Sequence, residues 1–67
     1  MEFKRYRLKK GLTMNQVAKA SGISESMYCL IENGKRTPSL RVIRRIASAL
    51  GCKLDDLVED VEGREKI

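Results

Sequence analysis

The side chains best suited to chemistry in this sequence are the thiols of Cys29 and Cys52, and the sequence contains no histidine. The two cysteines lie far apart and form no Cys-x-x-Cys pair, so a zinc site would need carboxylates to complete it and is not expected. In a reducing cytoplasm the simplest interpretation is two free, buried or half-buried thiols. A disulfide or a redox sensor is the alternative. The sequence therefore predicts no metal site.

The remaining polar side chains do not suggest catalysis. The chain has no nucleophile paired with a base and no glycine-rich phosphate loop, which are features expected of an enzyme site. We therefore expect no enzymatic activity and no cofactor. A chain of 67 residues can build only a thin core, so we expect its function to lie on its surface.

Charge is distributed unevenly along the chain. Residues 1–53 hold 12 Lys or Arg against three acids, a net charge of +9, whereas residues 54–67 hold two Lys or Arg against six acids, a net charge of −4. A basic body with an acidic tail favours a polyanionic partner for the body. We expect one domain over residues 1–61 and a short polar C-terminal tail over residues 62–67.

Hydropathy gives the expected location. No apolar run approaches the roughly 18 residues of a membrane span. The first ten residues, MEFKRYRLKK, lack the apolar region of a signal peptide. We therefore expect a cytoplasmic protein with no membrane partner.

The first third of the chain predicts two short helices. Periodicity places the first at about residues 2–10, closed by Gly11. Thr13 and Gln16 form a capping box that starts the second, which we expect to end at about Ser21. The first helix has on one face Phe3, Tyr6, Arg7 and Lys10. The second is expected to bury Val17, Ala18 and Ala20.

A third helix follows a tight turn at Gly22. Ser24 caps its beginning, and it ends at Asn33, before Gly34. The residues expected to point toward the core are Ile23, Tyr28 and Ile31.

Two further helices complete the chain. Pro38 and Ser39 open the fourth, which ends at Gly51. Its apolar residues at helical spacing are Leu40, Ile43, Ile46, Ala47 and Leu50. The fifth runs from about residue 54 to 60, buries Leu54 and Leu57, and has Asp55 and Asp56 in its first turn, where the helix dipole favours acids. No alternating strand pattern appears, so the predicted fold class is all-α with five helices.

The second and third helices, joined through Ser21-Gly22-Ile23, have the geometry of a helix-turn-helix. The glycine permits the turn, and the apolar residue after it pins both helices to one core. A basic loop, Lys35-Arg36, follows the third helix. Together these features favour DNA binding.

The sequence also resembles a known family, the Xre/Cro-type phage repressor helix-turn-helix proteins, over residues 3 to about 58 and without gaps. The motifs that carry the resemblance are Arg7-x3-Gly11-Leu12-Thr13, Val17-Ala18, Gly22-Ile23-Ser24, IENGKRTPSL over residues 31–40, Ile46-Ala47-x2-Leu50-Gly51 and Leu54-Asp55-x-Leu57. The resemblance implies a five-helix repressor-like domain. Its third helix would enter the DNA major groove, usually in a symmetric dimer on a palindromic operator.

In such a docking the N-terminus of the third helix points at base edges. The residues expected to contact bases are Ser24, Glu25, Ser26, Met27 and Leu30. A carboxylate can accept from a cytosine amino group, hydroxyls can bond to base or phosphate, and apolar side chains can meet thymine methyl groups. The alternative is that Ser24 only caps the helix and that Glu25 only complements its dipole.

A second set of residues is expected to hold DNA phosphates, which positions a protein without specifying sequence. The members of this set are Thr13, Asn15, Gln16, Asn33, Lys35 and Arg36. The alternative for Lys35 and Arg36 is a merely solvated basic surface.

Two further expectations concern structure and assembly. The resemblance implies an ion pair between Arg7 and Glu32 that fixes the third helix. A dimer surface is expected from the end of the fourth helix into the fifth. The residues expected there are Lys53, Leu54, Val58 and Val61; the alternative is that the two valines only complete the core or fray.

The sequence departs from the family at Met14, where glutamine is common, and at Leu30, where a polar or basic residue is more usual. With Met27 they make the base-contacting face unusually apolar, which leaves room for a protein partner or antagonist. We expect a small, nucleoid-associated repressor that binds double-stranded DNA as a homodimer, at least when bound to DNA. The alternative is a DNA-binding antitoxin or restriction-control component that also engages a protein.

Overall fold

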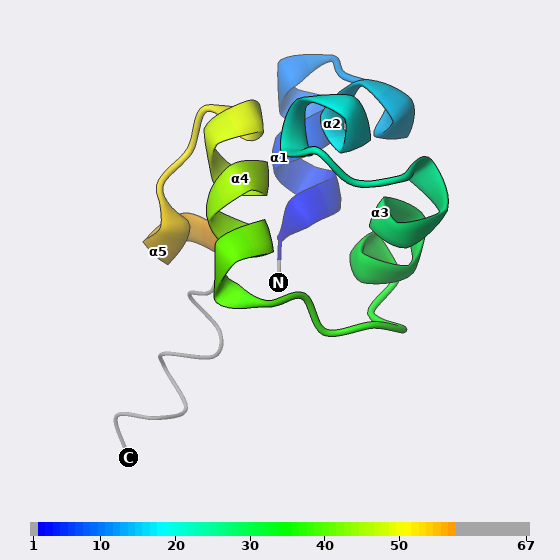
Figure 1. The fold of residues 1–67 in the computed structure, drawn as a ribbon. Helices are drawn as coiled ribbons and strands as arrows, with labels where there is room; N and C mark the ends of the chain where they lie inside the picture. Colours follow the sequence, from blue (N-terminus) through cyan, green and yellow to red (C-terminus); the bar gives the residue numbers. More distant parts are fainter. Residues whose placement is uncertain (1, 58–67) are drawn as a thin grey trace.

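Five helices make up the part of the chain that the structure, a computed structural model, describes, which is residues 2–57. They are α1 (Phe3–Lys10), α2 (Met14–Ser21), α3 (Glu25–Glu32), α4 (Leu40–Leu50) and α5 (Leu54–Leu57), and Figure 1 shows their arrangement. Residues 2–57 contain no strand, so the all-α prediction is confirmed. The predicted domain end at residue 61 and the tail at 62–67 lie outside the described residues, as do the last residues expected of the fifth helix.

Side-chain caps fix where three of these helices begin. The Thr13 hydroxyl accepts from the Gln16 backbone N–H at 3.1 Å, and the Gln16 side-chain oxygen accepts from the Thr13 N–H at 2.8 Å. Ser24 caps α3 by accepting from the Met27 N–H at 3.1 Å, and Ser39 caps α4 in the same way. Each cap satisfies a backbone donor that the helix itself leaves free and contributes about 1 kcal/mol. The predicted caps are confirmed.

The turn between α2 and α3 depends on Gly22. Its φ of 73° lies in the left-handed region that favours glycine. In this conformation the Gly22 N–H donates to the Lys19 carbonyl, and the Ile23 N–H donates to the Ala18 carbonyl at 3.0 Å. These bonds close α2 and start α3 after only a few residues. The predicted helix-turn-helix is therefore formed.

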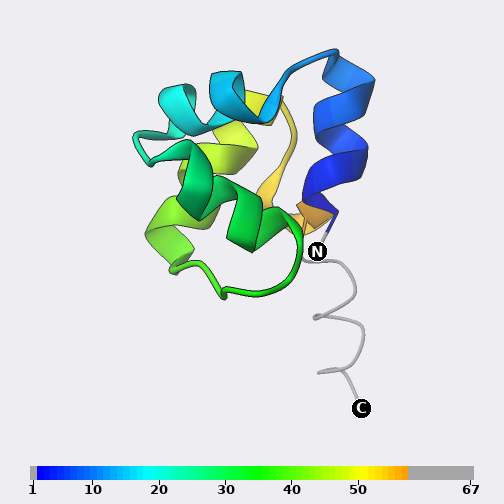
Figure 2. The same ribbon diagram turned by 90° about the vertical axis from the view of Figure 1, so that its right-hand side faces the viewer.

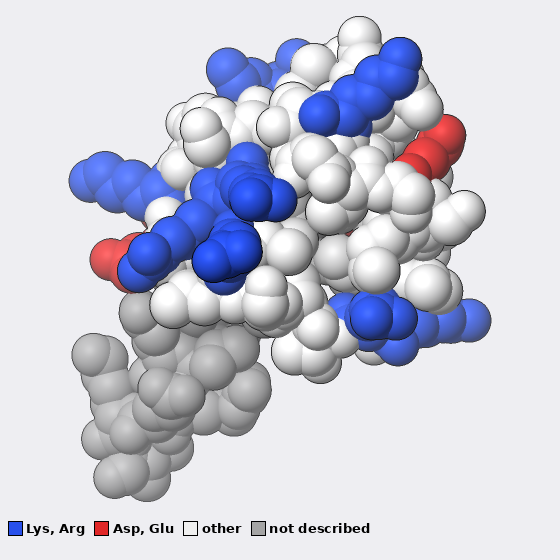
Figure 3. Space-filling view, viewed as in Figure 1, with Lys and Arg blue, Asp and Glu red and all other residues white. Residues whose placement is uncertain are grey.

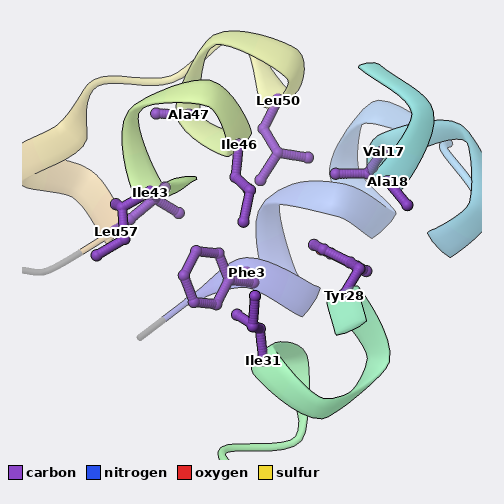
Figure 4. Packing of buried hydrophobic residues seen from close by; sticks show 10 residues of the cluster. All are labelled: Phe3, Val17, Ala18, Tyr28, Ile31, Ile43, Ile46, Ala47, Leu50 and Leu57. Atoms are coloured by element: carbon purple, nitrogen blue, oxygen red, sulfur yellow. The ribbon is translucent and has the colours of Figure 1, made fainter. Parts of the chain in front are cut away.

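All five helices contribute to one core, shown in Figure 4. Its buried apolar residues are Phe3, Val17, Ala18, Tyr28, Ile31, Ile43, Ile46, Ala47, Leu50 and Leu57. The turn residue Ile23 packs against this core, as do Tyr6 and Leu54. α2 contacts both α3 and α4, so it holds α3 against the rest of the molecule.

Three residues named for the expected helix faces are exposed, one of which, Ala20, was expected to be buried. Ala20 is exposed, and Ser21 takes its place in the core. With about 100° between successive residues, Ser21 lies between Val17 and Ala18 around the helix, whereas Ala20 lies on the flank. Leu40, at the edge of the apolar stripe of α4, is 54% exposed. Lys10 is also exposed. Its aliphatic chain lies against Gly51, where an added β-carbon would approach Lys10 Cε to 2.9 Å.

Charged groups at the junction of α1 and α3 form a closed cluster. Arg7 Nε donates to Glu32 Oε2 at 2.7 Å and Nη2 donates to Oε1 at 3.1 Å, so the pair is bidentate. The third Arg7 nitrogen donates to the Leu12 carbonyl at 2.9 Å, and the Tyr28 hydroxyl donates to Glu32 Oε2 at 3.0 Å. The two charged side chains are only 11% and 4% exposed. The carboxylate therefore has a donor on each oxygen where water has little access.

Removing one member of this cluster should cost more than the pair itself contributes. Arg7→Met should lower the free energy of unfolding by about 3 kcal/mol, because it leaves the Glu32 charge buried and unpaired. Glu32→Gln should also be destabilising, because the Arg7 guanidinium keeps its charge and loses its carboxylate partner. Thermal and denaturant unfolding of both variants and the double variant should give a coupling energy of roughly 1–3 kcal/mol. Additive single effects would show that the two groups do not interact.

The cluster also predicts how stability depends on pH. Burial, and next the Glu32 carboxylate, raise the pKa of Tyr28 above its ordinary value of 10.0. The folded protein thus holds this proton more tightly than the unfolded chain does. The resulting stability is complete below pH 10.0 and is lost as pH rises above it. Tyr28→Phe should show a shallower loss of unfolding free energy in alkaline buffer.

The Tyr28→Phe protein and the protein that keeps Tyr28 should both carry Cys52→Ser. This substitution removes a second group that titrates in alkaline buffer. Burial, and then Asp56, raise the pKa of the Cys52 thiol, so its titration destabilises the fold in the same direction. Equal slopes with and without the Tyr28→Phe substitution would contradict the assignment to Tyr28.

Candidate nucleic-acid interface

The outer face of α3 is the candidate surface, and Figure 2 looks onto it, with α2 above α3 and the loop after α3 below. Tyr28 and Ile31 turn inward and are buried. Glu25, Ser26 and Leu30 are exposed. One side of the helix is therefore fixed by the core while the other is free to meet a partner.

The five residues predicted to contact bases do not all lie together. Glu25, Ser26 and Leu30 line one open hollow on the surface, together with Met14 and Cys29. Ser24 is exposed, and its hydroxyl caps α3, so it has a structural role.

Met27 is placed apart from this hollow. It is half-buried, packs against the core and lines a groove on the side of α4 with residues such as Pro38 and Val42. On the helix surface Met27 lies next to the buried Ile31, on the side of α3 that also carries the buried Tyr28. Its side chain is therefore turned away from the outer face. Its position favours a packing role over base contact.

Asn15 joins the starts of α2 and α3. Its side-chain amide donates to Glu25 Oε1 at 3.1 Å, so the side chain expected to hold phosphate instead contacts a predicted base-contacting residue. The bond orients the carboxylate and leaves Oε2 available to accept from another group. Nothing in the sequence pattern indicated this contact, because it joins side chains of two different helices.

The other predicted phosphate contacts fall into two groups. Thr13 and Gln16 are exposed but engaged in the capping box, and the Asn33 amide donates to Cys29 Sγ at 3.3 Å. Lys35 and Arg36 are exposed in the loop after α3. Of the six, these two cations are best suited to phosphate.

Basic side chains lie on the face of the molecule that adjoins the candidate surface. In Figure 3, which has the same view as Figure 1, Lys and Arg lie over α2, over α4 and at the loop below α3, and acidic atoms lie at the right-hand edge beside α3. Basic groups at the loop and on α2 favour a polyanionic partner.

The residues expected at a dimer surface are only partly described. Lys53 is exposed, and its backbone N–H donates to Asp56 Oδ2 at 3.1 Å, which caps α5. Leu54 is half-buried against the core. Val58 and Val61 lie outside the described residues.

Neither a metal site nor a membrane span is found in residues 2–57. No group of three or more potential metal ligands occurs in this part of the chain. None of its helices has the length and apolar character needed to cross a membrane.

Comparison with known proteins agrees with this geometry. The family model described as "Helix-turn-helix" matches residues 3–57, from α1 to α5. The chain belongs to this Xre/Cro-like helix-turn-helix family. The family consists of DNA-binding transcriptional regulators and is not an enzyme family. The expectations of a DNA-binding regulator and of no enzymatic activity are therefore confirmed.

Relatives and a solved structure support the same assignment. The chain is 45% identical over 58 residues to YqaF of Bacillus subtilis, an HTH-type transcriptional regulator, covering 87% of this chain and 76% of YqaF. It is 38% identical to another such regulator from Methanocaldococcus jannaschii, covering 84% and 85% of the two chains. The structure superposes on the clp gene regulator ClgR from C. glutamicum with a TM-score of 0.82, at 26% identity, over 92% of this chain and 80% of that one.

The interface predicts that substitutions will separate affinity from sequence preference. Lys35→Ala and Arg36→Ala should weaken binding to every duplex alike, because phosphate is common to all sequences. Glu25→Ala should instead change the preference at particular base pairs by roughly 1–3 kcal/mol. Binding of each variant to a set of single-base-substituted duplexes measures both effects.

Lys4→Ala is a matched control, because Lys4 is an exposed lysine on α1. It should weaken binding much less than Lys35→Ala. A Glu25→Ala protein with an unchanged preference would leave Glu25 with only a structural role.

Proposed function

We propose that this protein is a sequence-specific repressor that binds double-stranded DNA with α3 in the major groove. The observation that carries the proposal is the outer face of α3. Glu25 and Ser26 are exposed there at the capped end of α3, and Leu30 is exposed about one turn further on. Lys35 and Arg36 follow immediately in the loop.

The dimensions of α3 suit this role. An α-helix with its side chains is about 10–12 Å across, which fits a major groove about 12 Å wide, and the eight residues of α3 give it a length of about 12 Å. Glu25 offers an acceptor to a cytosine amino group, and Lys35 and Arg36 offer charge to flanking phosphates. Helix and loop together thus supply both specificity and position.

We further propose that two copies bind a palindromic operator. One helix of this length contacts only a few base pairs, too few for a site to stand out among the ~10⁶ or more competing positions in a genome. Two copies on half-sites about one helical turn apart multiply the discrimination. The segment from Lys53 and Leu54 toward Val58 and Val61 is the proposed contact between them. A contact this small binds weakly, so the dimer forms chiefly on DNA.

Selection of preferred sites from random duplexes tests the proposal. We expect an inverted repeat whose affinity exceeds that for unrelated duplex, with a slope of log K against log salt of about −0.9 for each phosphate neutralised. Sedimentation of the complex should give two chains per site, filled cooperatively. One chain per site without cooperativity would contradict the dimer, and equal affinity for selected and unrelated duplexes at every salt concentration would contradict the proposed function.

A further inference from the structure

The outer surface of α3 carries an open hollow beside the start of α2. Its volume is about 440 Å³, and its lining consists of Met14, Glu25, Ser26, Cys29 and Leu30. Leu30 is 40% exposed, while Met14 and Cys29 are half-buried. Three of the five lining side chains are thus thioether, thiol and hydrocarbon, on the face that the proposed function turns toward the bases.

The polar wall of this hollow is fixed in place. Asn15 donates to Glu25 Oε1 at 3.1 Å, which ties the carboxylate to α2. A carboxylate facing a phosphate backbone is repelled unless a base offers it a donor, and the amino groups of cytosine and adenine are the donors in the major groove. The hollow therefore combines an oriented acceptor with an apolar pocket.

We propose that the hollow formed by Met14, Cys29 and Leu30 receives the C5-methyl group of a thymine, next to a base whose amino group donates to Glu25. This inference rests on the proposed function and specifies which base that surface selects. Among the four standard bases only thymine presents a methyl group in the major groove. Leu30 and Met14 have no donor for the acceptors of guanine, so they favour the methyl group over those edges.

The same apolar surface would suit a protein that covers it, and the two occupants make different demands. A protein needs a broad area, whereas a methyl group needs only one small apolar contact. The surroundings favour DNA, because the hollow is lined by α3 and the start of α2, and the loop bearing Lys35 and Arg36 follows directly after α3. Figure 2 shows α2 above α3 and this loop below it. We therefore propose DNA as the occupant of the hollow.

Replacing single thymines of the selected operator by deoxyuridine removes only the methyl group and tests the inference. We expect one position in each half-site at which this change weakens binding about fourfold, the factor for one buried methyl group. In Leu30→Asn the same change should have no effect at that position. Leu30 is exposed, so this variant should keep its fold, which its melting temperature will verify.

Leu8→Asn provides the matched control, because Leu8 is an exposed leucine of α1, 58% accessible. It should respond to deoxyuridine as the unaltered protein does. Met14→Gln should reduce the response, since it replaces one apolar wall of the hollow by an amide.

Each result has a distinct meaning. Specific binding that ignores deoxyuridine at every position would overturn the inference and leave the proposed function intact. So would a Leu30→Asn protein that keeps the full response, because the methyl group would then be contacted elsewhere and the hollow would remain open to another occupant, such as a protein. Failure to select any preferred sequence would overturn the proposed function, and this inference with it.

Discussion

The bidentate pair between Arg7 and Glu32 is the interaction on which the position of α3 depends. An isolated helix of eight residues is not stable in water, so α3 exists only because its inner face is held. Tyr28 and Ile31 bury that face, and the Arg7–Glu32 pair adds a directional constraint that apolar contacts lack. Buried ion pairs often contribute little net stability, because desolvation offsets attraction. We therefore assign this pair a positional role, in which the angle between α1 and α3 is set by hydrogen-bond geometry.

Because the inner face is fixed, the outer face of α3 can vary in chemistry without loss of fold. Glu25, Ser26 and Leu30 make no contribution to the buried core. The Ser24 hydroxyl caps α3 through the Met27 backbone N–H, and the turn at Gly22 is closed by backbone bonds, so neither involves the exposed side chains of α3. The fold thus separates the residues that build the helix from the residues that a partner meets.

Sequence alone predicted the parts of this molecule that depend on local rules. Caps such as Thr13 and Ser39 lie where a helix must begin, and the apolar period of α4 identified its buried stripe. The prediction of buried residues was wrong where neighbouring positions of a helix are both compatible with burial. Ala20 is apolar and is expected to be buried, but the helix geometry buries Ser21, whose hydroxyl has no hydrogen-bond partner among the described residues. The bond between Asn15 and Glu25 depends on how α2 and α3 cross, which no local pattern encodes.

The chemistry of the outer face also bears on why two copies would be needed. A negative carboxylate and an apolar leucine on α3 add little attraction for phosphates, which we propose comes from loop cations such as Lys35 and Arg36. Glu25 even opposes that attraction unless a base donates to it. In the proposed DNA complex such a helix would gain discrimination and lose general affinity, so that wrong sequences are penalised more than correct ones are rewarded. In the proposed dimer, pairing of two weakly attached copies would restore affinity only where both half-sites are correct, which would make the selectivity of α3 effective.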